Sequence, residues 1–130
     1  MIVLDAGVLI AYGDSRDTHH AAAVDFLTEH CDHEFAISPL TLAEVLVRPA
    51  MADRVGEALS VFMDLDLVVN DIREVDAVVL SKTRASTTLK MPDALVVHVA
   101  VRDSAHIATT DAVLASKARE LGIHTYLVTA

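Results

Sequence analysis

The alternation of short apolar runs with longer segments of helical periodicity is the feature that most constrains the fold of this chain. The short runs are typical of buried strands, and the segments between them repeat apolar residues at helical spacing. Strands that alternate with helices form a parallel sheet with helices on both faces. We therefore expect one α/β domain over residues 1–130, a three-layer α/β/α sandwich with a central parallel sheet.

The pattern also predicts where individual elements lie. Strands are expected at 2–4, 35–37, 65–69, 107–109 and 124–129, and helices at 6–12, 18–30, 39–48, 52–63, 72–84, 92–102 and 112–121. Ser38 is the expected N-cap of the third helix, and Pro49 is expected to end it. Asp71 and Glu74 have the spacing of a capping box for the fifth helix. The polar segment 85–90 is expected to be a loop.

Three acidic residues fall where strands end or helices begin. Asp5 ends the first strand, Asp111 follows the fourth, and Asp93 lies in the first turn of the helix that Pro92 opens. In an open parallel sheet, these positions share one edge, which carries the binding crevice where the strand order reverses. We expect Asp5 and Asp111 to face that crevice together, and Asp93 can join them if its helix packs over it. Aspartate is also favoured at helix N-termini for capping, which explains each position without any function.

A fourth acid, Glu44, lies inside the helix opened by Pro39. Its neighbours in Leu40–Val47 are nearly all apolar, which predicts a helix buried on all sides. An ionised carboxylate there needs compensation. Arg48, four residues on, is one source, and a cation shared with the other acids is the second. The spacing alone leaves both open.

Four carboxylates that converge repel one another, and a bound cation removes that cost. A ligand set made only of oxygen selects hard ions such as Mg²⁺ or Mn²⁺. Such ions activate water and stabilise a leaving oxygen, which is the chemistry of phosphodiester hydrolysis.

With these residues identified, the chain resembles PIN domains, and specifically the VapC-type toxins of bacterial toxin–antitoxin pairs. The matching segments occur in the family's order and span essentially the whole chain: Val3-Leu4-Asp5, Leu42-Ala43-Glu44-Val45-Leu46, Pro92-Asp93-Ala94-Leu95 and Thr109-Thr110-Asp111. No single segment is specific. The four acids in order, within an alternating α/β pattern, carry the resemblance.

The resemblance implies a metal-dependent endoribonuclease that cuts tRNA or ribosomal RNA. Asp5, Glu44, Asp93 and Asp111 would be the catalytic acids that bind Mg²⁺ or Mn²⁺, and Thr109 would be the hydroxyl residue that often precedes the last acid by two positions. VapC toxins usually dimerise and are silenced by a small antitoxin protein. The implied partners are therefore RNA, a cognate antitoxin and a second copy of the chain.

One departure favours an alternative function. The family often has Thr or Ser after its first Asp, followed by Asn or Ser, whereas Ala6 and Gly7 follow Asp5 here. A polar contact near the metal is then missing, which would weaken metal binding. The alternative is a catalytically weak PIN-like module that acts mainly through a protein partner.

The net charge of −9, from 19 acidic and 10 basic residues, opposes a uniformly basic RNA-binding surface. RNA contact then requires a local basic patch, a bound metal or a basic partner. Lys82, Arg84 and Lys90 form the densest basic stretch and are the candidates for such a patch. Cations are also favoured near helix C-termini, so a solvated helix end explains these residues without RNA contact.

Other features narrow the location and the chemistry. The single cysteine excludes a disulfide within the chain, residues 1–5 lack the basic start of a secretory signal, and no apolar run is long enough to span a membrane. A cytoplasmic protein is expected. The seven histidines do not show the spacing of a zinc site. A haloacid-dehalogenase-type phosphatase would need a second acid where Gly7 stands.

Overall fold

The structure is a computed structural model that describes residues 1–130. Its strands are β1 (Ile2–Leu4), β2 (Phe35–Ile37), β3 (Val68–Val69), β4 (His106–Thr109) and β5 (Thr125–Leu127). Its helices are α1 (Ala6–Gly13), α2 (His20–Glu29), α3 (Pro39–Met51), α4 (Val55–Met63), α5 (Asp76–Thr87), α6 (Met91–Arg102) and α7 (Ala112–Glu120). No helix is both long enough and apolar enough to cross a membrane.

All five strands are parallel, in the order β3-β2-β1-β4-β5. Strands β2 and β3 follow in turn on one side of the central β1. The chain then crosses back, and β4 and β5 follow in turn on the other side. The strand order therefore reverses between β1 and β4, which is where open α/β sheets place their binding crevice. The expected fold class and its parallel sheet are confirmed.

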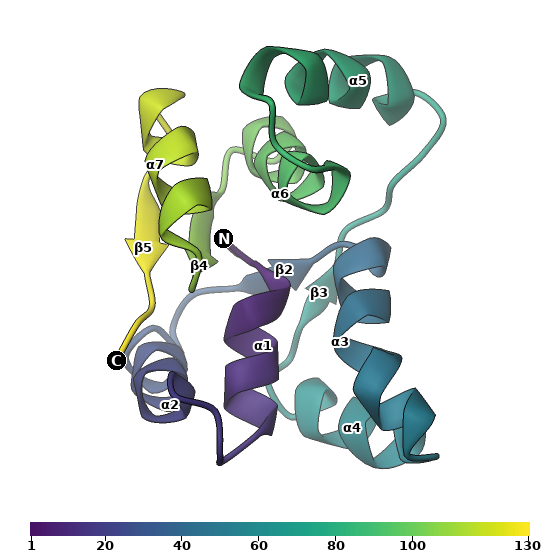
Figure 1. The fold of residues 1–130 in the computed structure, drawn as a ribbon, viewed down its shortest axis with the longest axis vertical. Coiled ribbons are helices and arrows are strands. Elements are labelled where there is room, and N and C mark those ends of the chain that lie inside the picture. Colours follow the sequence, from purple (N-terminus) through teal and green to yellow (C-terminus); the bar gives the residue numbers. More distant parts are fainter.

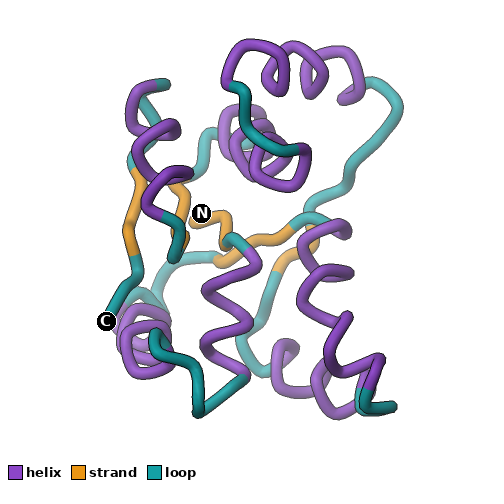
Figure 2. Tube along the Cα trace, in the orientation of Figure 1, coloured by secondary structure: helices purple, strands orange, loops and turns teal.

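Helices cover both faces of the sheet (Figures 1 and 2). Helices α1 to α4 lie on one side and α5 to α7 on the other (Figure 1). Neighbouring residues of β1 point to opposite faces, because side chains alternate along a strand. Ile2 and Leu4 pack into the core cluster under α1 and α2, whereas Val3 packs into the cluster under α6 and α7. This double burial explains why β1 is apolar at every position.

Three helix starts follow the capping chemistry of the sequence. The Ser38 hydroxyl accepts a hydrogen bond from the backbone N–H of Thr41, which opens α3. Asp5 and Asp111 cap α1 and α7 through their carboxylates. Each cap satisfies a backbone N–H that has no partner inside the helix.

Several predicted boundaries are wrong. Helix α3 continues through Pro49 to Met51, because a proline in the last turn removes only one hydrogen bond. Helix α5 begins at Asp76, so Asp71 and Glu74 do not form a capping box, and it extends through Thr87 into the segment expected to be a loop. Strand β3 is shorter than predicted and α4 starts three residues later than predicted.

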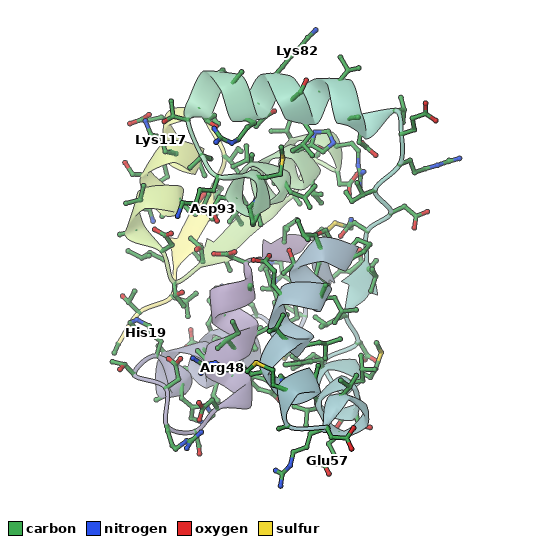
Figure 3. The ribbon with its side chains drawn as sticks, turned by 45° about the vertical axis from the view of Figure 1, so that its right-hand side comes forward. His19, Arg48, Glu57, Lys82, Asp93 and Lys117 are labelled. Atoms are coloured by element: carbon green, nitrogen blue, oxygen red, sulfur yellow. The ribbon has the colours of Figure 1, made fainter.

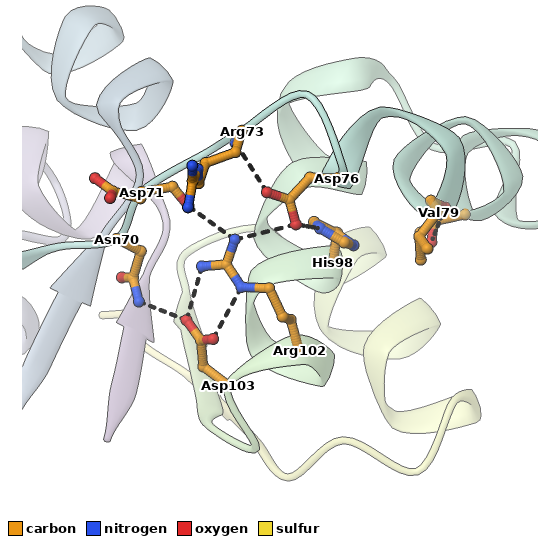
Figure 4. Close-up of polar contacts among 9 residues, drawn as sticks. Asn70, Asp71, Arg73, Asp76, Val79, His98, Arg102 and Asp103 are labelled. Carbon is orange, nitrogen blue, oxygen red and sulfur yellow. Dashed lines mark hydrogen bonds and ion pairs between the residues drawn. The ribbon is translucent and has the colours of Figure 1, made fainter.

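A polar network fastens α5 and the preceding loop to α6 (Figure 4). Asp76, only 6% exposed, accepts a hydrogen bond from the Arg73 backbone N–H, one from Arg102 at 3.2 Å, and pairs with His98 Nε2 at 2.8 Å. Arg102 also contacts both carboxylate oxygens of Asp103 at 2.9 Å. Because Asp93 lies in the first turn of α6, the helix that carries His98 and Arg102, this network helps to hold that acid in place.

The hydrogen bond from the Arg73 backbone N–H, with those from His98 and Arg102, lowers the pKa of Asp76 from 3.8 to about 2. A lowered folded-state pKa stabilises the fold above the unfolded pKa, and the contribution is lost as the pH falls toward 2. We expect Asp76→Asn to be less stable than the parent at pH 7, with the difference shrinking between pH 4 and pH 2. Urea unfolding across this range measures it. A constant difference, or the same loss in the exposed control Asp71→Asn, would contradict the prediction.

Candidate active site

Asp5 and Asp111 lie at the point where the strand order reverses. Leu4 pairs with Ala108 across β1 and β4, and the Asp5 backbone N–H donates to the Ala108 carbonyl at 2.9 Å. The Thr109 hydroxyl then donates to Asp5 Oδ2 at 2.7 Å and accepts from the Asp111 backbone N–H at 3.0 Å. One buried threonine thus links the two acids, in the position that the sequence predicted for a supporting hydroxyl.

Glu44 from α3 and Asp93 from α6 lie within electrostatic reach of this pair. Burial is the main cause of a raised pKa at Asp5, Glu44 and Asp93. Charge repulsion adds to it. Asp111 raises the pKa of both Asp5 and Asp93, and Asp5 raises that of both Glu44 and Asp93. The four acids that the sequence singled out therefore lie within electrostatic reach of one another, although not close enough together to share one ion as the side chains stand.

The negative charge of this cluster is largely uncompensated. No ion pair joins any of the four acids to a basic side chain. Arg48 does not pair with Glu44, and its charge acts on Asp14 instead. Lys90 is the one cation that lowers the pKa of Asp93. Helix α3 is also less buried than expected, since only Thr41 and Val45 are fully covered.

The donor chemistry fits a hard divalent cation. All the donors are carboxylate oxygens, and burial with mutual repulsion disfavours their ionised forms until a positive charge is added. As the side chains stand, no three histidine, cysteine, aspartate or glutamate residues are close enough together to hold one ion. The fit rests on ligand type and charge.

The three predicted RNA-binding residues are not gathered at the acids. Lys90, one residue before α6, acts electrostatically on Asp93. Lys82 extends from the outer side of α5, away from Asp93 (Figure 3). Arg84 is exposed in the last turn of α5. Only Lys90 has an established relation to the site.

The PIN domain family matches residues 2–120. The chain belongs to this family. PIN domains are generally nucleases, which agrees with a carboxylate cluster at the reversal point of the sheet.

Solved structures share the PIN fold of this chain at low sequence identity. A toxin–antitoxin complex from Klebsiella pneumoniae aligns with a TM-score of 0.69 and 23% identity over 85% of this chain and 87% of that one. VapBC2 from Rickettsia felis, bound to a promoter DNA fragment, aligns at 0.75 and 16% over 96% and 97%. FitAcB from Neisseria gonorrhoeae aligns at 0.68 and 17% over 97% and 96%. No curated protein matches the chain.

The structure explains why glycine follows Ala6 in this PIN domain. A Cβ atom at position 7 would collide with the hydroxyl of Thr110, in the loop that leads to Asp111. Glycine therefore lets α1 approach the β4–α7 loop closely. The Ala6 backbone N–H and the Thr109 hydroxyl each engage one oxygen of Asp5. Asp5 is thus held at both oxygens although no polar side chain follows it, which the sequence pattern did not reveal.

We expect Gly7→Ala to destabilise the protein by about 1–3 kcal/mol, the usual cost of overpacking. A glycine-to-alanine change in a helix ordinarily stabilises by about 0.5–1 kcal/mol, so the sign is diagnostic. Thr110→Ala in the Gly7→Ala background should recover most of the loss, because it removes the colliding hydroxyl. Chemical unfolding of the parent, both single variants and the double variant tests this. Additive effects would show that the two positions do not touch.

We expect Asp93→Asn to raise the melting temperature in EDTA at pH 7. A carboxyl whose folded-state pKa is raised costs stability while ionised, so a neutral amide relieves the cluster. The advantage should shrink as the pH falls and the parent's Asp93 takes up its proton. Asp25→Asn, at an exposed acid outside the cluster, removes the same charge as a control. An equal rise in the melting temperature of that control would show that the effect comes from net charge alone.

Proposed function

We propose that this PIN domain is a Mg²⁺- or Mn²⁺-dependent endoribonuclease that cleaves tRNA or ribosomal RNA as the toxin of a toxin–antitoxin pair. The observation that carries the proposal is the uncompensated charge of four carboxylates at the reversal point of the sheet. A structural cluster of acids would be paired with basic side chains, because buried unpaired charges are costly.

Asp5, Glu44, Asp93 and Asp111 would hold the ion, which when bound supplies an activated water and stabilises negative charge on phosphate oxygens. Thr109 orients Asp5 by donating to Oδ2, and the same hydroxyl accepts the Asp111 backbone N–H. Asp111 Oδ1 is already engaged by the N–H groups of Val113 and Leu114. These hydrogen bonds fix two carboxylates from two strands before any ligand arrives. Lys90, beside Asp93, would contact a phosphate of the RNA.

The proposed partners are a cognate antitoxin and a second copy of the chain. Similar structures are described as toxin–antitoxin complexes, which supports an antitoxin here. A net charge of −9 suits a basic partner segment, and a Lys or Arg inserted among the four acids would replace the cation and silence the site. Exposed apolar residues at the start of α5, Val75, Val78 and Val79, support burial of surface against a second copy. Because the proposed substrates, tRNA and ribosomal RNA, are found in the cytoplasm, the proposed activity would take place there.

A catalytically weak module that acts through its protein partner is the second candidate. The absence of a polar side chain at positions 6 and 7 favours it.

Incubation of total bacterial RNA with the purified chain separates the two candidates. We expect discrete fragments with Mg²⁺ or Mn²⁺, and none with EDTA, because the acids need the cation to act on a phosphodiester. Asp93→Asn should lose at least about a hundredfold in rate, the scale on which removal of one charge-stabilising group acts. Mapped fragment ends would name the substrate.

The control is Asp25→Asn, which should cleave like the parent. Intact RNA in every lane, from folded protein free of antitoxin, would favour the binding module. Cleavage that survives EDTA or Asp93→Asn would remove the metal or this residue from the mechanism.

A further inference from the structure

Two histidines lie side by side where strands β4 and β5 begin, at the opposite end of the strands from the carboxylates. Ile107 pairs with Thr125 across β4 and β5, so the preceding residues, His106 and His124, occupy neighbouring positions. Their ring centroids are 4.6 Å apart, with an interplanar angle of 59°. Both residues are exposed. His106 is the first residue of β4 and His124 immediately precedes β5, whereas Asp5 and Asp111 follow the ends of β1 and β4.

The ring nitrogens of this pair are not hydrogen-bonded within the chain. The other five histidines each have a ring nitrogen in a polar contact: His19, His20, His30, His33 and His98. Tyr126 packs against His124 at a centroid distance of 4.7 Å and also contacts His30 at 4.9 Å. The pair therefore belongs to a continuous aromatic surface but has no polar partner.

The surroundings also lower the pKa of His106. Partial desolvation is the main cause, and the nearby charges of His124, the terminal amino group and His33 add to it. A neutral imidazole presents a free lone pair, which is the form that coordinates a cation. Nitrogen donors suit Zn²⁺, Ni²⁺ and Cu²⁺, whereas carboxylate oxygens suit Mg²⁺ and Mn²⁺.

We propose that His106 and His124 form a binding site for a first-row transition-metal ion such as Zn²⁺ or Ni²⁺, separate from the carboxylate cluster. Because no three potential ligands converge as the side chains stand, the protein supplies a two-histidine chelate and water completes the coordination.

Binding there would fasten the edge strand β5 to β4. An ion that both histidines hold only in the folded chain stabilises that state by mass action. Strand β4 leads directly into Thr109 and Asp111, so the proposed ion and the carboxylates lie at opposite ends of the same strand. The site does not depend on the nuclease proposal, since it uses none of those residues.

Calorimetric titration and thermal unfolding with Ni²⁺ alone test the proposal, in the Asp93→Asn background to weaken binding at the acids. We expect Ni²⁺ to raise the melting temperature. His106→Ala and His124→Ala should each weaken binding by about tenfold or more, since both ligands of a chelate are needed. Their melting temperatures without metal should stay at the value of the background, because both side chains are exposed.

His19→Ala/His20→Ala removes two other imidazoles and serves as the matched control. Retention of Ni²⁺ affinity in this control, with loss in both single variants, supports the chelate. Equal loss in the control, or unchanged affinity after His106→Ala or His124→Ala, would overturn it.

Discussion

Parallel pairing of β1 with β4 is the constraint on which both the fold and the candidate active site depend. The chain leaves β1 in one direction and rejoins it through β4 on the other side, after about a hundred residues of intervening structure. That pairing buries Val3 and Ile107 in one core cluster and Leu4 and Ala108 in the other. It also aligns the ends of the two strands, so that Thr109 reaches Asp5. A slip of one residue would exchange the two faces and separate these groups.

Two sets of buried carboxylates show how their surroundings decide their behaviour. Asp76 is surrounded by donors, including a backbone N–H, a histidine and an arginine, and its pKa is lowered. Asp5 is also hydrogen-bonded, but burial and Asp111 outweigh its donors, and its pKa is raised. The first arrangement stabilises the fold as it stands. The second leaves a cost that a cation or a basic partner can remove, which is expected at a functional site rather than a structural one.

The sequence predicted what local rules and strand polarity determine. The parallel sheet, the caps at Asp5, Ser38 and Asp111, and the proximity of Asp5 to Asp111 followed from periodicity and from the shared edge of parallel strands. Contacts between distant segments left no such signal. The approach of Gly7 to Thr110, the pairing of Asp76 with His98, and the neighbouring positions of His106 and His124 depend on register, which spacing does not reveal. Local rules also failed where tertiary contacts determined the structure. Helix α5 begins at Asp76, which contacts His98 and Arg102, and not at the predicted capping box.

Strand polarity also separates two kinds of ligand chemistry in this domain. Helices α1, α6 and α7 begin at the edge where the strands end, and their positive dipole ends partly offset the charge of nearby acids. The opposite edge is where the strands begin. Asp5, Asp93 and Asp111 lie at the first edge, and His106 and His124 lie at the second. The parallel sheet therefore places carboxylate oxygens and imidazole nitrogens at opposite ends of β4, and under the two proposals hard and borderline cations would be distinguished by position as well as by ligand type.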